Sequence, residues 1–451
     1  MRVRHGKIAV VFTVASAAWA GTLTLPEAQE LLFTNNPDVQ IAEAKYLKSL
    51  VAVSEAKASY YPTAETHTYY NYQSKPNRID VDTELDGIIP TFGQALGLTG
   101  LEDRPIELNL SEPVGDHDRF EWGVDISYPV FTGFSRKYSV AARQAGSTVY
   151  CLESITVKDR LSLRLGLLYF AWELSVKRLE VQKTYIDQVS EHVVQVRNLY
   201  EAGVEARSKV LEASARLESA KVDMLAAEGV VDSLRLELID FLRIRDTLAT
   251  PGEYEYELPQ HVIDSRPRPY REEIVTIDST LSQLELTKRA LFGQRLPRLV
   301  AMAGYRVGNP GIVMGGDEFI DWGVAGLQLR WTIYEGQKNW AKREQLNHDM
   351  QILKRQREKQ LAKWEKMAAQ ERLQIQKAHR MHSAAKLALD AAVAFAEDLE
   401  NALTAGVVSS TEYLNALAAV SNARFRVARA ETMRKMACLR LAYALGESME
   451  F

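Results

Sequence analysis

Four segments of the chain alternate between apolar and polar side chains with a period of two. They cover about residues 63–73, 119–131, 298–307 and 320–334. Successive side chains of a β-strand point to opposite faces, so this pattern predicts four strands, each with one apolar and one polar face.

Two long tracts without proline follow these strand segments, at about residues 136–202 and 337–405. Their apolar residues recur at three-four spacing, as Val189, Val193 and Val196 do. This spacing is typical of helices that pack as coiled coils. At a rise of 1.5 Å per residue, each helix would be about 100 Å long.

The chain carries two copies of one arrangement. Gly203 and Gly406 stand at the ends of the two long tracts, 203 residues apart, and Gly133 and Gly336 have the same separation. A repeat of this length indicates a duplicated half-protein, since solenoid units are much shorter.

The duplication suggests a domain organisation. We expect a first repeat over 21–245, an inter-repeat linker (the equatorial region) over 246–268 and a second repeat over 269–451. Each glycine would end its long helix in a tip turn, at about 203–209 and 406–411. Shorter return helices then reach Arg243 and Gly446. A helix broken near Asn36-Pro37 precedes the first strand, another covers Pro269–Leu296, and the linker contains an alternating segment, Glu253–Leu258, compatible with a short strand.

The N-terminus has the pattern of a secretory signal peptide over residues 1–20. Arg2, Arg4 and Lys7 precede an apolar run, and Ala18-Trp19-Ala20 fits the small-residue cleavage pattern. The chain is therefore expected to be exported.

Two cysteines in an exported chain would ordinarily suggest a disulfide. Measured along the predicted helices from their tips, however, Cys151 and Cys438 differ in height by about 30 Å. A disulfide requires Cα atoms about 4.4–6.8 Å apart, so we predict two free thiols.

Charge and motifs exclude several classes of function. The net charge of −4 gives no signature of nucleic-acid binding. No nucleophile elbow, phosphate-binding loop or dinucleotide motif is present, so we expect neither an enzyme nor a bound cofactor or metal. Residues 75–118 are strongly acidic, a composition that favours a solvated, partly disordered loop.

The four strands point to a membrane and to several copies of the chain. Two hairpins cannot close a sheet, and unpaired strand edges do not survive in lipid. Three copies would supply twelve strands, an allowed barrel size. Aromatic residues stand at the helix-proximal strand ends, where an interfacial girdle belongs: Tyr60, Tyr61, Tyr128, Phe131, Trp331 and Tyr334.

Over its whole mature length the chain resembles the TolC-like outer membrane efflux proteins. The motifs that carry the resemblance, duplicated at one offset, are Leu25–Leu31 with Asn36-Pro37, Tyr61-Pro62, Leu296-Pro297, Tyr128–Gly133, Tyr200–Gly203 and Thr404–Gly406. The fold class implied is mainly α with membrane β: long helical hairpins forming a periplasmic α-barrel, and four strands per subunit in a trimeric 12-stranded β-barrel. Arg243 departs from the family, which usually has glycine there.

The resemblance implies the partners as well. They are two further copies of the chain in a homotrimer, outer membrane lipids, a periplasmic adaptor (membrane fusion) protein and an inner-membrane pump of RND or ABC type. The chain would be a passive duct of an efflux or type I secretion system, in the outer membrane and the periplasm. The tips would contact the adaptor, with these candidates: Gly203, Arg207, Ser208, Gly406 and Thr411.

Some family members close the periplasmic entrance with two carboxylate rings and an arginine link. Aligned on Gly406, the outer carboxylate falls on Glu412, the second position on the uncharged Asn415, and the arginine position on Val408. A local explanation of Glu412 is also open, because Ser409-Ser-Thr-Glu412 is a capping box for the return helix. Both roles are compatible, and we hypothesise that Glu412 favours the passage of cations.

The polar strand faces distinguish a duct from a structural periplasmic coiled-coil protein without a conducting role. Charged and polar side chains on these faces would suit a water-filled lumen, and the candidates are Glu65, His67, Asn71, Asp125 and Arg330.

Overall fold

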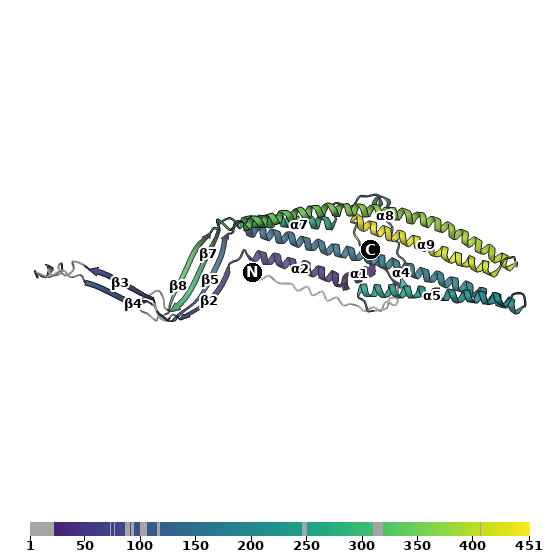
Figure 1. Cartoon of the computed structure of the whole chain (residues 1–451), viewed down its shortest axis with the longest axis horizontal. Coiled ribbons are helices and arrows are strands. Elements are labelled where there is room, and N and C mark those ends of the chain that lie inside the picture. Colours follow the sequence, from purple (N-terminus) through teal and green to yellow (C-terminus); the bar gives the residue numbers. More distant parts are fainter. Residues whose placement is uncertain are drawn as a thin grey trace. The chain divides into compact units, whose positions relative to one another are not determined.

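The computed structural model describes residues 22–72, 74–75, 77–85, 91, 94–99, 106–114, 118–245, 250–309, 319–405 and 407–451 (Figure 1). The chain divides into two compact units. The helical unit comprises Met1–Leu50, Ala145–Ser282 and Asp349–Phe451, and the strand unit comprises Val51–Gln144 and Gln283–His348.

The strand unit contains a four-stranded antiparallel sheet in the order β2-β5-β7-β8. The strands are β2 (Thr63–Tyr72), β5 (Asp118–Phe131), β7 (Arg298–Asn309) and β8 (Ile320–Arg330). A bulge interrupts the β5–β7 register between Pro129 and Phe131. β8 ends four residues earlier than the alternation predicted, because Trp331–Tyr334 continue the pattern of side chains without strand pairing.

The register gives the sheet two chemically different faces. Directly paired residues of neighbouring strands lie on the same face. The pairs Thr68–Trp122 and Trp122–Val307 therefore belong to a face rich in aromatic and aliphatic side chains, whereas Glu65–Asp125 belongs to the opposite, polar face. The strand pairing thus keeps the predicted separation of apolar and polar residues across the sheet.

The acidic segment 75–118 was expected to be a solvated, partly disordered loop, and for its described part this is wrong, because two paired strands lie there. β3 (Asn77–Leu85) and β4 (Ile106–Val114) form an antiparallel hairpin in which Val81 pairs with Leu110. The abundance of acids hid a period of two, since Ile79, Val81 and Thr83 alternate with Asp80, Asp82 and Glu84.

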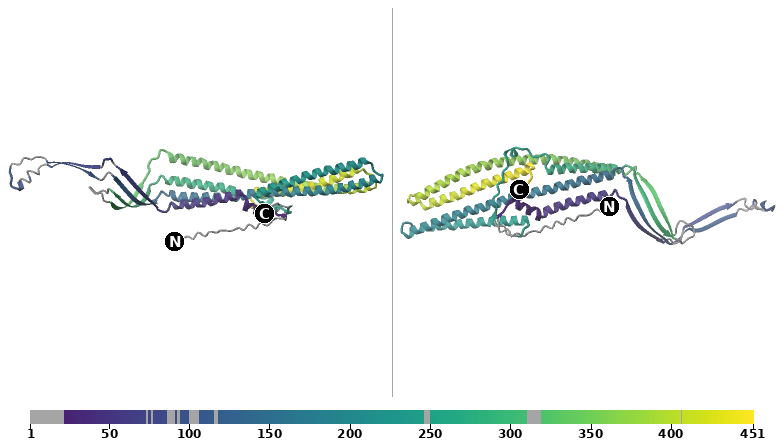
Figure 2. Two further views of the ribbon diagram at one scale, coloured as in Figure 1. Left: turned by 90° about the horizontal axis from the view of Figure 1, so that it is seen from below. Right: turned by 180° about the vertical axis from the view of Figure 1, so that it is seen from behind.

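The helical unit is dominated by two long hairpins. α4 (Ser135–Glu201) is followed by α5 (Arg207–Leu242), and α8 (Lys338–Thr404) is followed by α9 (Ser410–Leu445). Within the unit, each return helix lies beside its long partner (Figures 1 and 2). None of the helices in the described part of the chain has a stretch both long and apolar enough to cross a membrane.

Shorter elements complete the chain. They are α1 (Leu25–Asn35), α2 (Pro37–Ala58), α6 (Gln260–Ile263) and α7 (Glu272–Gly293). The linker strand lies earlier than expected, because β6 (Thr250–Pro251) pairs in parallel with β1 (Thr22–Leu23). The alternating residues Tyr254, Tyr256 and Leu258 instead pack against the core without strand partners. Their period of two therefore records one-sided burial and not strand pairing.

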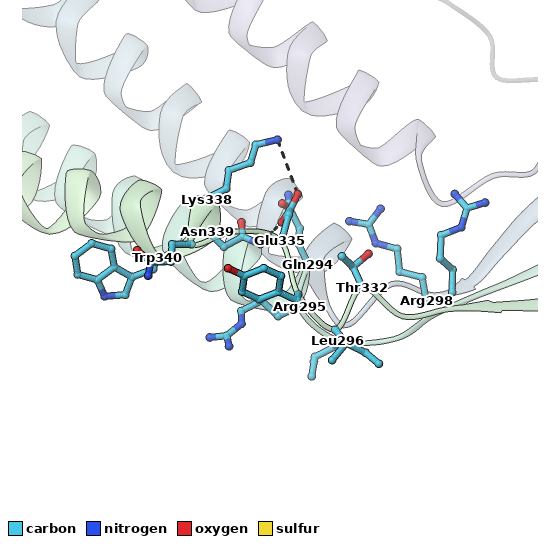
Figure 3. Close-up of a pocket in the computed structure, with 13 residues that line it drawn as sticks. Gln294, Arg295, Leu296, Arg298, Thr332, Glu335, Lys338, Asn339 and Trp340 are labelled. Atoms are coloured by element: carbon cyan, nitrogen blue, oxygen red, sulfur yellow. Dashed lines mark hydrogen bonds and ion pairs between the residues drawn. The ribbon is translucent and has the colours of Figure 1, made fainter.

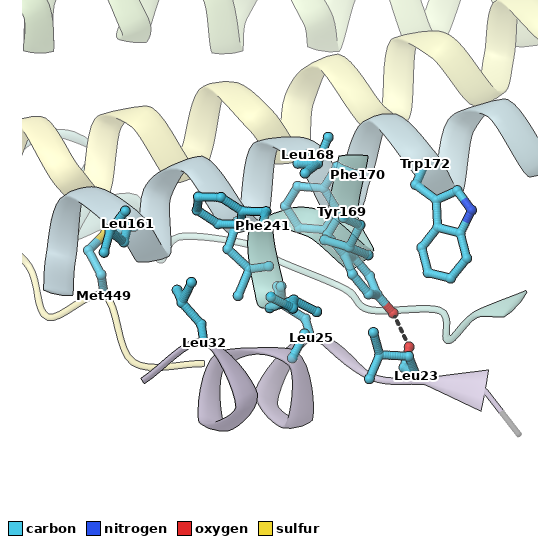
Figure 4. Packing of buried hydrophobic residues seen from close by; sticks show 14 of the residues in the cluster. Leu23, Leu25, Leu32, Leu161, Leu168, Tyr169, Phe170, Trp172, Phe241 and Met449 are labelled. Atoms are coloured by element: carbon cyan, nitrogen blue, oxygen red, sulfur yellow. Dashed lines mark hydrogen bonds between the residues drawn. The ribbon is translucent and has the colours of Figure 1, made fainter. Parts of the chain in front are cut away.

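The main core of the helical unit surrounds three aromatic residues of α4 (Figure 4). Tyr169, Phe170 and Trp172 are completely buried among residues of α1, α5 and α9. The Tyr169 hydroxyl lies 2.7 Å from the carbonyl oxygen of Leu23 and 2.6 Å from that of Gly252, so it fixes β1 and β6 on the helices.

The C-terminal residue and the two cysteines belong to the same unit. Phe451 packs against Tyr254 and Tyr256. Cys438 is buried, Cys151 is partly buried, and both are free thiols in the structure.

Candidate functional site at the helical tips

The first tip joins α4 to α5 through Ala202–Ala206. Gly203 has a left-handed φ of 74°. Its amide donates to the Tyr200 carbonyl at 2.9 Å, and the Val204 amide donates to the Leu199 carbonyl at 2.9 Å. These two bonds are the Schellman pattern, which ends a helix by satisfying its last carbonyls. Gly203, Arg207 and Ser208 are exposed.

The described residues of the second tip make one of these two bonds and give the return helix a better start. The Val407 amide donates to the Ala402 carbonyl at 2.9 Å, as the Schellman pattern requires. Gly406 itself lies outside the described residues. α5 follows Ala206, which provides no side-chain cap, whereas α9 has Ser409 as its N-cap.

Glu412 closes the capping box of α9. Its Oε2 accepts hydrogen bonds from the Ser409 amide at 2.9 Å and the Ser409 hydroxyl at 3.0 Å. The Glu412 amide in turn donates to Ser409 Oγ at 3.3 Å. These donors lower the pKa of Glu412, so the exposed carboxylate stays ionised. The cap is therefore present and leaves the negative charge at the surface.

The other two gate candidates lie in different surroundings. Val408 is partly buried beside the tip, while Asn415 is exposed on α9. The Asn415 Oδ1 accepts a hydrogen bond from Arg216 of α5 at 3.4 Å, and Arg216 also donates to the Tyr185 hydroxyl of α4 at 3.3 Å. An arginine contact is thus present at the Asn415 position, although it comes from the other repeat.

A polar bridge near the tips joins the two hairpins, and sequence reasoning missed it. Thr411 donates to Glu212 Oε1 at 2.6 Å, and Lys209 Nζ lies 3.3 Å from Thr411 Oγ1 and 3.1 Å from Glu212 Oε2. The bond from Thr411, followed by those from Lys209, lowers the pKa of Glu212. The three-residue spacing of Lys209 and Glu212 was a signal for their pairing on one helix face.

A buried histidine makes a second link between the repeats. His192 of α4 is almost fully buried, and its Nε2 lies 2.6 Å from the hydroxyl of Ser410 in α9. Its ring centroid is 5.2 Å from that of Tyr413. Burial lowers the pKa of His192, because a charged imidazolium would be poorly solvated there.

Apolar packing surrounds these polar links. The cluster draws Tyr185, Val189 and Val193 from α4, Ala213 from α5 and Leu414 from α9, together with neighbours. The two hairpins therefore meet through a small apolar seam with polar contacts beside it. No group of three or more potential metal ligands is found among the described residues.

The five lumen candidates all lie on the polar face of the sheet. Glu65 pairs with Asp125, His67 with Gly123, and Asn71 with Arg119. Gly123 in turn pairs with Arg306, which places Arg306 on this face too. Arg330 pairs with Arg298, an even number of residues from Arg306, so it belongs to the same face.

Four of these face residues form a charge cluster across three strands. His67 lies 3.4 Å from Glu121 and 3.2 Å from Asp125, and Arg306 lies 3.5 Å and 3.4 Å from the same carboxylates. Gly123 stands at the centre, and a Cβ there would lie 2.7 Å from His67 Cε1. The glycine therefore makes the room that the cluster needs.

The comparisons with known proteins agree with this architecture. The family model described as outer membrane efflux protein matches residues 29–242 and 277–447. Comparison with curated protein sequences gives no match.

Several solved structures have the same fold. One is CusC, for which folding and transmembrane channel formation are described; its identity is 14%, its TM-score is 0.72, and the alignment covers 94% of this chain and 92% of CusC. VceC, an outer membrane protein of Vibrio cholerae, has 13% identity and a TM-score of 0.71, with 94% and 96% covered. The CmeC outer membrane channel of Campylobacter jejuni has 13% identity and a TM-score of 0.70, with 95% and 86% covered. With the family model matched over both halves, the chain belongs to the outer membrane efflux protein family.

Proposed function

We propose that this outer membrane channel component of an efflux system works as a homotrimeric passive duct. The observation that carries the proposal is the four-stranded sheet with two open edges. β2 and β8 are its outer strands, and within the described residues each pairs on one side only. An open edge is unstable in lipid, whereas three such sheets joined edge to edge would make a closed twelve-stranded barrel.

The two faces of the sheet suit this assembly. The apolar face would contact outer membrane lipids, and the polar face with His67, Asp125 and Arg306 would line a water-filled lumen. The chain would then conduct solutes without chemistry of its own. The alternative, a structural periplasmic protein without a conducting role, leaves the charge cluster on the polar face without a purpose.

The tips are the proposed contact surface for a periplasmic adaptor protein, which would connect the duct to an inner-membrane pump of RND or ABC type. Gly203, Arg207 and Ser208 at the first tip are exposed, and Thr411 at the second is partly buried. The proposal is that a partner that competes for polar contacts such as Thr411–Glu212 would change the spacing of the hairpins. A helix reversal at Gly203 presents its turn at the far end of the hairpin, where a partner can reach it.

Two measurements test this proposal. The mass of the purified protein in detergent, determined by light scattering with the detergent contribution subtracted, should equal three chains. The same sample in a planar bilayer should give stable single-channel currents. A monomeric mass, or a trimer that inserts without conducting, would favour the structural alternative.

The gate hypothesis for Glu412 has a matched pair of variants. Glu412→Gln removes the charge but keeps a side chain that closes a capping box, whereas Ser409→Ala removes the N-cap and keeps the charge. We expect Glu412→Gln alone to lower the ratio of cation to anion permeability, while Ser409→Ala should cost about 1 kcal/mol of α9 stability. An unchanged permeability ratio in Glu412→Gln contradicts the hypothesis.

A further inference from the structure

Two arginines face each other directly at the end of the sheet that adjoins the helices. Arg298 of β7 and Arg330 of β8 are register partners. Side chains in such positions have Cβ atoms about 5 Å apart, and like charges there are destabilising. In the described part of the chain, no ion pair or hydrogen bond is found for either guanidinium, and both residues are exposed. No partner among the described residues offsets this repulsion, whereas a bound external anion would offset it.

The pair borders a hollow of about 840 Å³, to which Thr332 and Lys338 also contribute. Figure 3 shows Arg298, Thr332 and Lys338 on one side of the backbone, with Arg295 directed to the other side. Glu335 is the one acidic residue among the described residues of this lining. It is already engaged, since it accepts a hydrogen bond from Asn339 at 2.7 Å and lies 3.9 Å from Lys338 Nζ. The acid does not reach the arginine pair in any ion pair or hydrogen bond of the structure.

Arg298 also borders a second hollow of about 380 Å³, formed with Arg136, Arg143 and Glu55. Arg136 is occupied by the carbonyls of Ser59 and Pro129, but no acidic partner is found for Arg143 in the described residues. Without Arg295, whose side chain is directed to the other side, the described residues of the two linings include five basic and two acidic side chains. The positive charge is therefore a property of this region and not of one residue.

The surroundings of Arg298 and Arg330 differ from those of the charge cluster further along the same face. There Glu121 and Asp125 neutralise Arg306 and hydrogen-bond or pair with His67. Among the described residues, no carboxylate pairs with the guanidinium group of Arg298 or Arg330. Arginine presents a planar fork of donors that matches the oxygens of a phosphate or a carboxylate.

We propose that Arg298 and Arg330 form a binding site for multivalent oxyanions, such as phosphate- or carboxylate-rich solutes, on the polar face of the sheet. This inference rests on the proposed function, because only in the duct does that face line the lumen. Three copies would then place six arginines around the path of a passing solute. The field is screened over about 10 Å at 0.1 M salt, so binding should weaken with ionic strength.

The test measures tripolyphosphate binding by isothermal titration calorimetry on the full-length protein in nanodiscs. We expect saturable binding at low salt that weakens at least tenfold in the double variant Arg298→Gln/Arg330→Gln. Arg295→Gln is the matched control, an arginine of the same hollow whose side chain points away, and it should bind like the unmodified protein. Absence of binding, or equal loss in the control, overturns the proposal.

Two further measurements are needed. One distinguishes a dissolved oxyanion from a lipid headgroup, and the other distinguishes the oxyanion site from the proposed duct. Equal binding of tripolyphosphate in nanodiscs of phosphatidylcholine and of phosphatidylglycerol supports a lumenal site. Loss of binding in the anionic phosphatidylglycerol would mean that lipid headgroups occupy the arginines, and it would overturn the proposal. In planar bilayers, tripolyphosphate should reduce the current of the unmodified channel and not that of the double variant. A protein that binds tripolyphosphate but carries no current would refute the proposed conducting duct and would still support the oxyanion site.

Discussion

Gly133 and Gly336 occupy equivalent places in the two repeats, and replacing each with alanine should have unequal effects. Both have a left-handed backbone, with φ of 62° and 57°. A residue other than glycine in this conformation costs about 1–2 kcal/mol. If backbone strain were the only factor, the two variants would be equally destabilised.

Their surroundings differ. A Cβ at Gly133 would overlap the carbonyl oxygen of Gly293 and lie 2.7 Å from Leu296 Cβ, whereas at Gly336 no atom lies within 4 Å. Overpacking against a backbone adds about 1–3 kcal/mol. We therefore expect Gly336→Ala to cost about 1–2 kcal/mol and Gly133→Ala about 2–5 kcal/mol.

Hydrogen exchange followed by mass spectrometry measures the difference locally. The peptides to compare are 129–140 and 332–343, which contain the two turns. An additional 1–3 kcal/mol corresponds to roughly 5- to 150-fold faster exchange around Gly133, since about 1.4 kcal/mol is a factor of ten. Equal acceleration in the two variants would refute the argument that the close approach of Gly133 and Gly293 requires glycine.

Two other predictions concern the helical unit. Arg271 is buried, donates hydrogen bonds to the Tyr443 and Ala444 carbonyls, pairs with Glu273 and lies 3.8 Å from the centre of the Trp364 ring. Arg271→Met should lower the free energy of unfolding in urea by about 3–5 kcal/mol, because it leaves Glu273 without its partner. Adding Glu273→Leu should recover part of this loss. The buried His192 has a pKa below the ordinary 6.5, so its contact with α9 should be strongest above pH 6.5 and weaken as pH falls toward the folded-state pKa. The free energy of unfolding in urea should therefore fall between pH 7.5 and pH 5.5. This fall should be smaller in His192→Gln and unchanged in the exposed control His348→Gln.

The departure at Arg243 shows how far a local rule predicts a local structure. The family usually has glycine there, yet α5 ends at Leu242 with Arg243 as its C-cap at φ 55°, and the Arg243 guanidinium pairs with Asp240 at 2.8 Å. The Ile244 amide donates to the Ile239 carbonyl as in the Schellman pattern. The helix end therefore depends on hydrogen bonding, and glycine only makes the backbone conformation less costly.

Periodicity determined most of the local architecture from sequence alone. The period of two located β2, β5 and β7, and three-four spacing without proline located α4 and α8, because both patterns record which side of an element is buried. The same reasoning identified the capping box of Ser409 and Glu412, whose partners are three residues apart. It failed for β3 and β4, where composition was weighed above alternation.

Only the tertiary structure decided which side chains meet. Thr411 and Glu212 are 199 residues apart, as are Asn415 and Arg216, and no spacing rule along one helix relates them. The opposition of Arg298 and Arg330 likewise depends on the register of two strands, since a shift of one residue would send one arginine to the other face. Local patterns follow from the geometry of a single helix or strand, whereas these contacts depend on how separate elements pack.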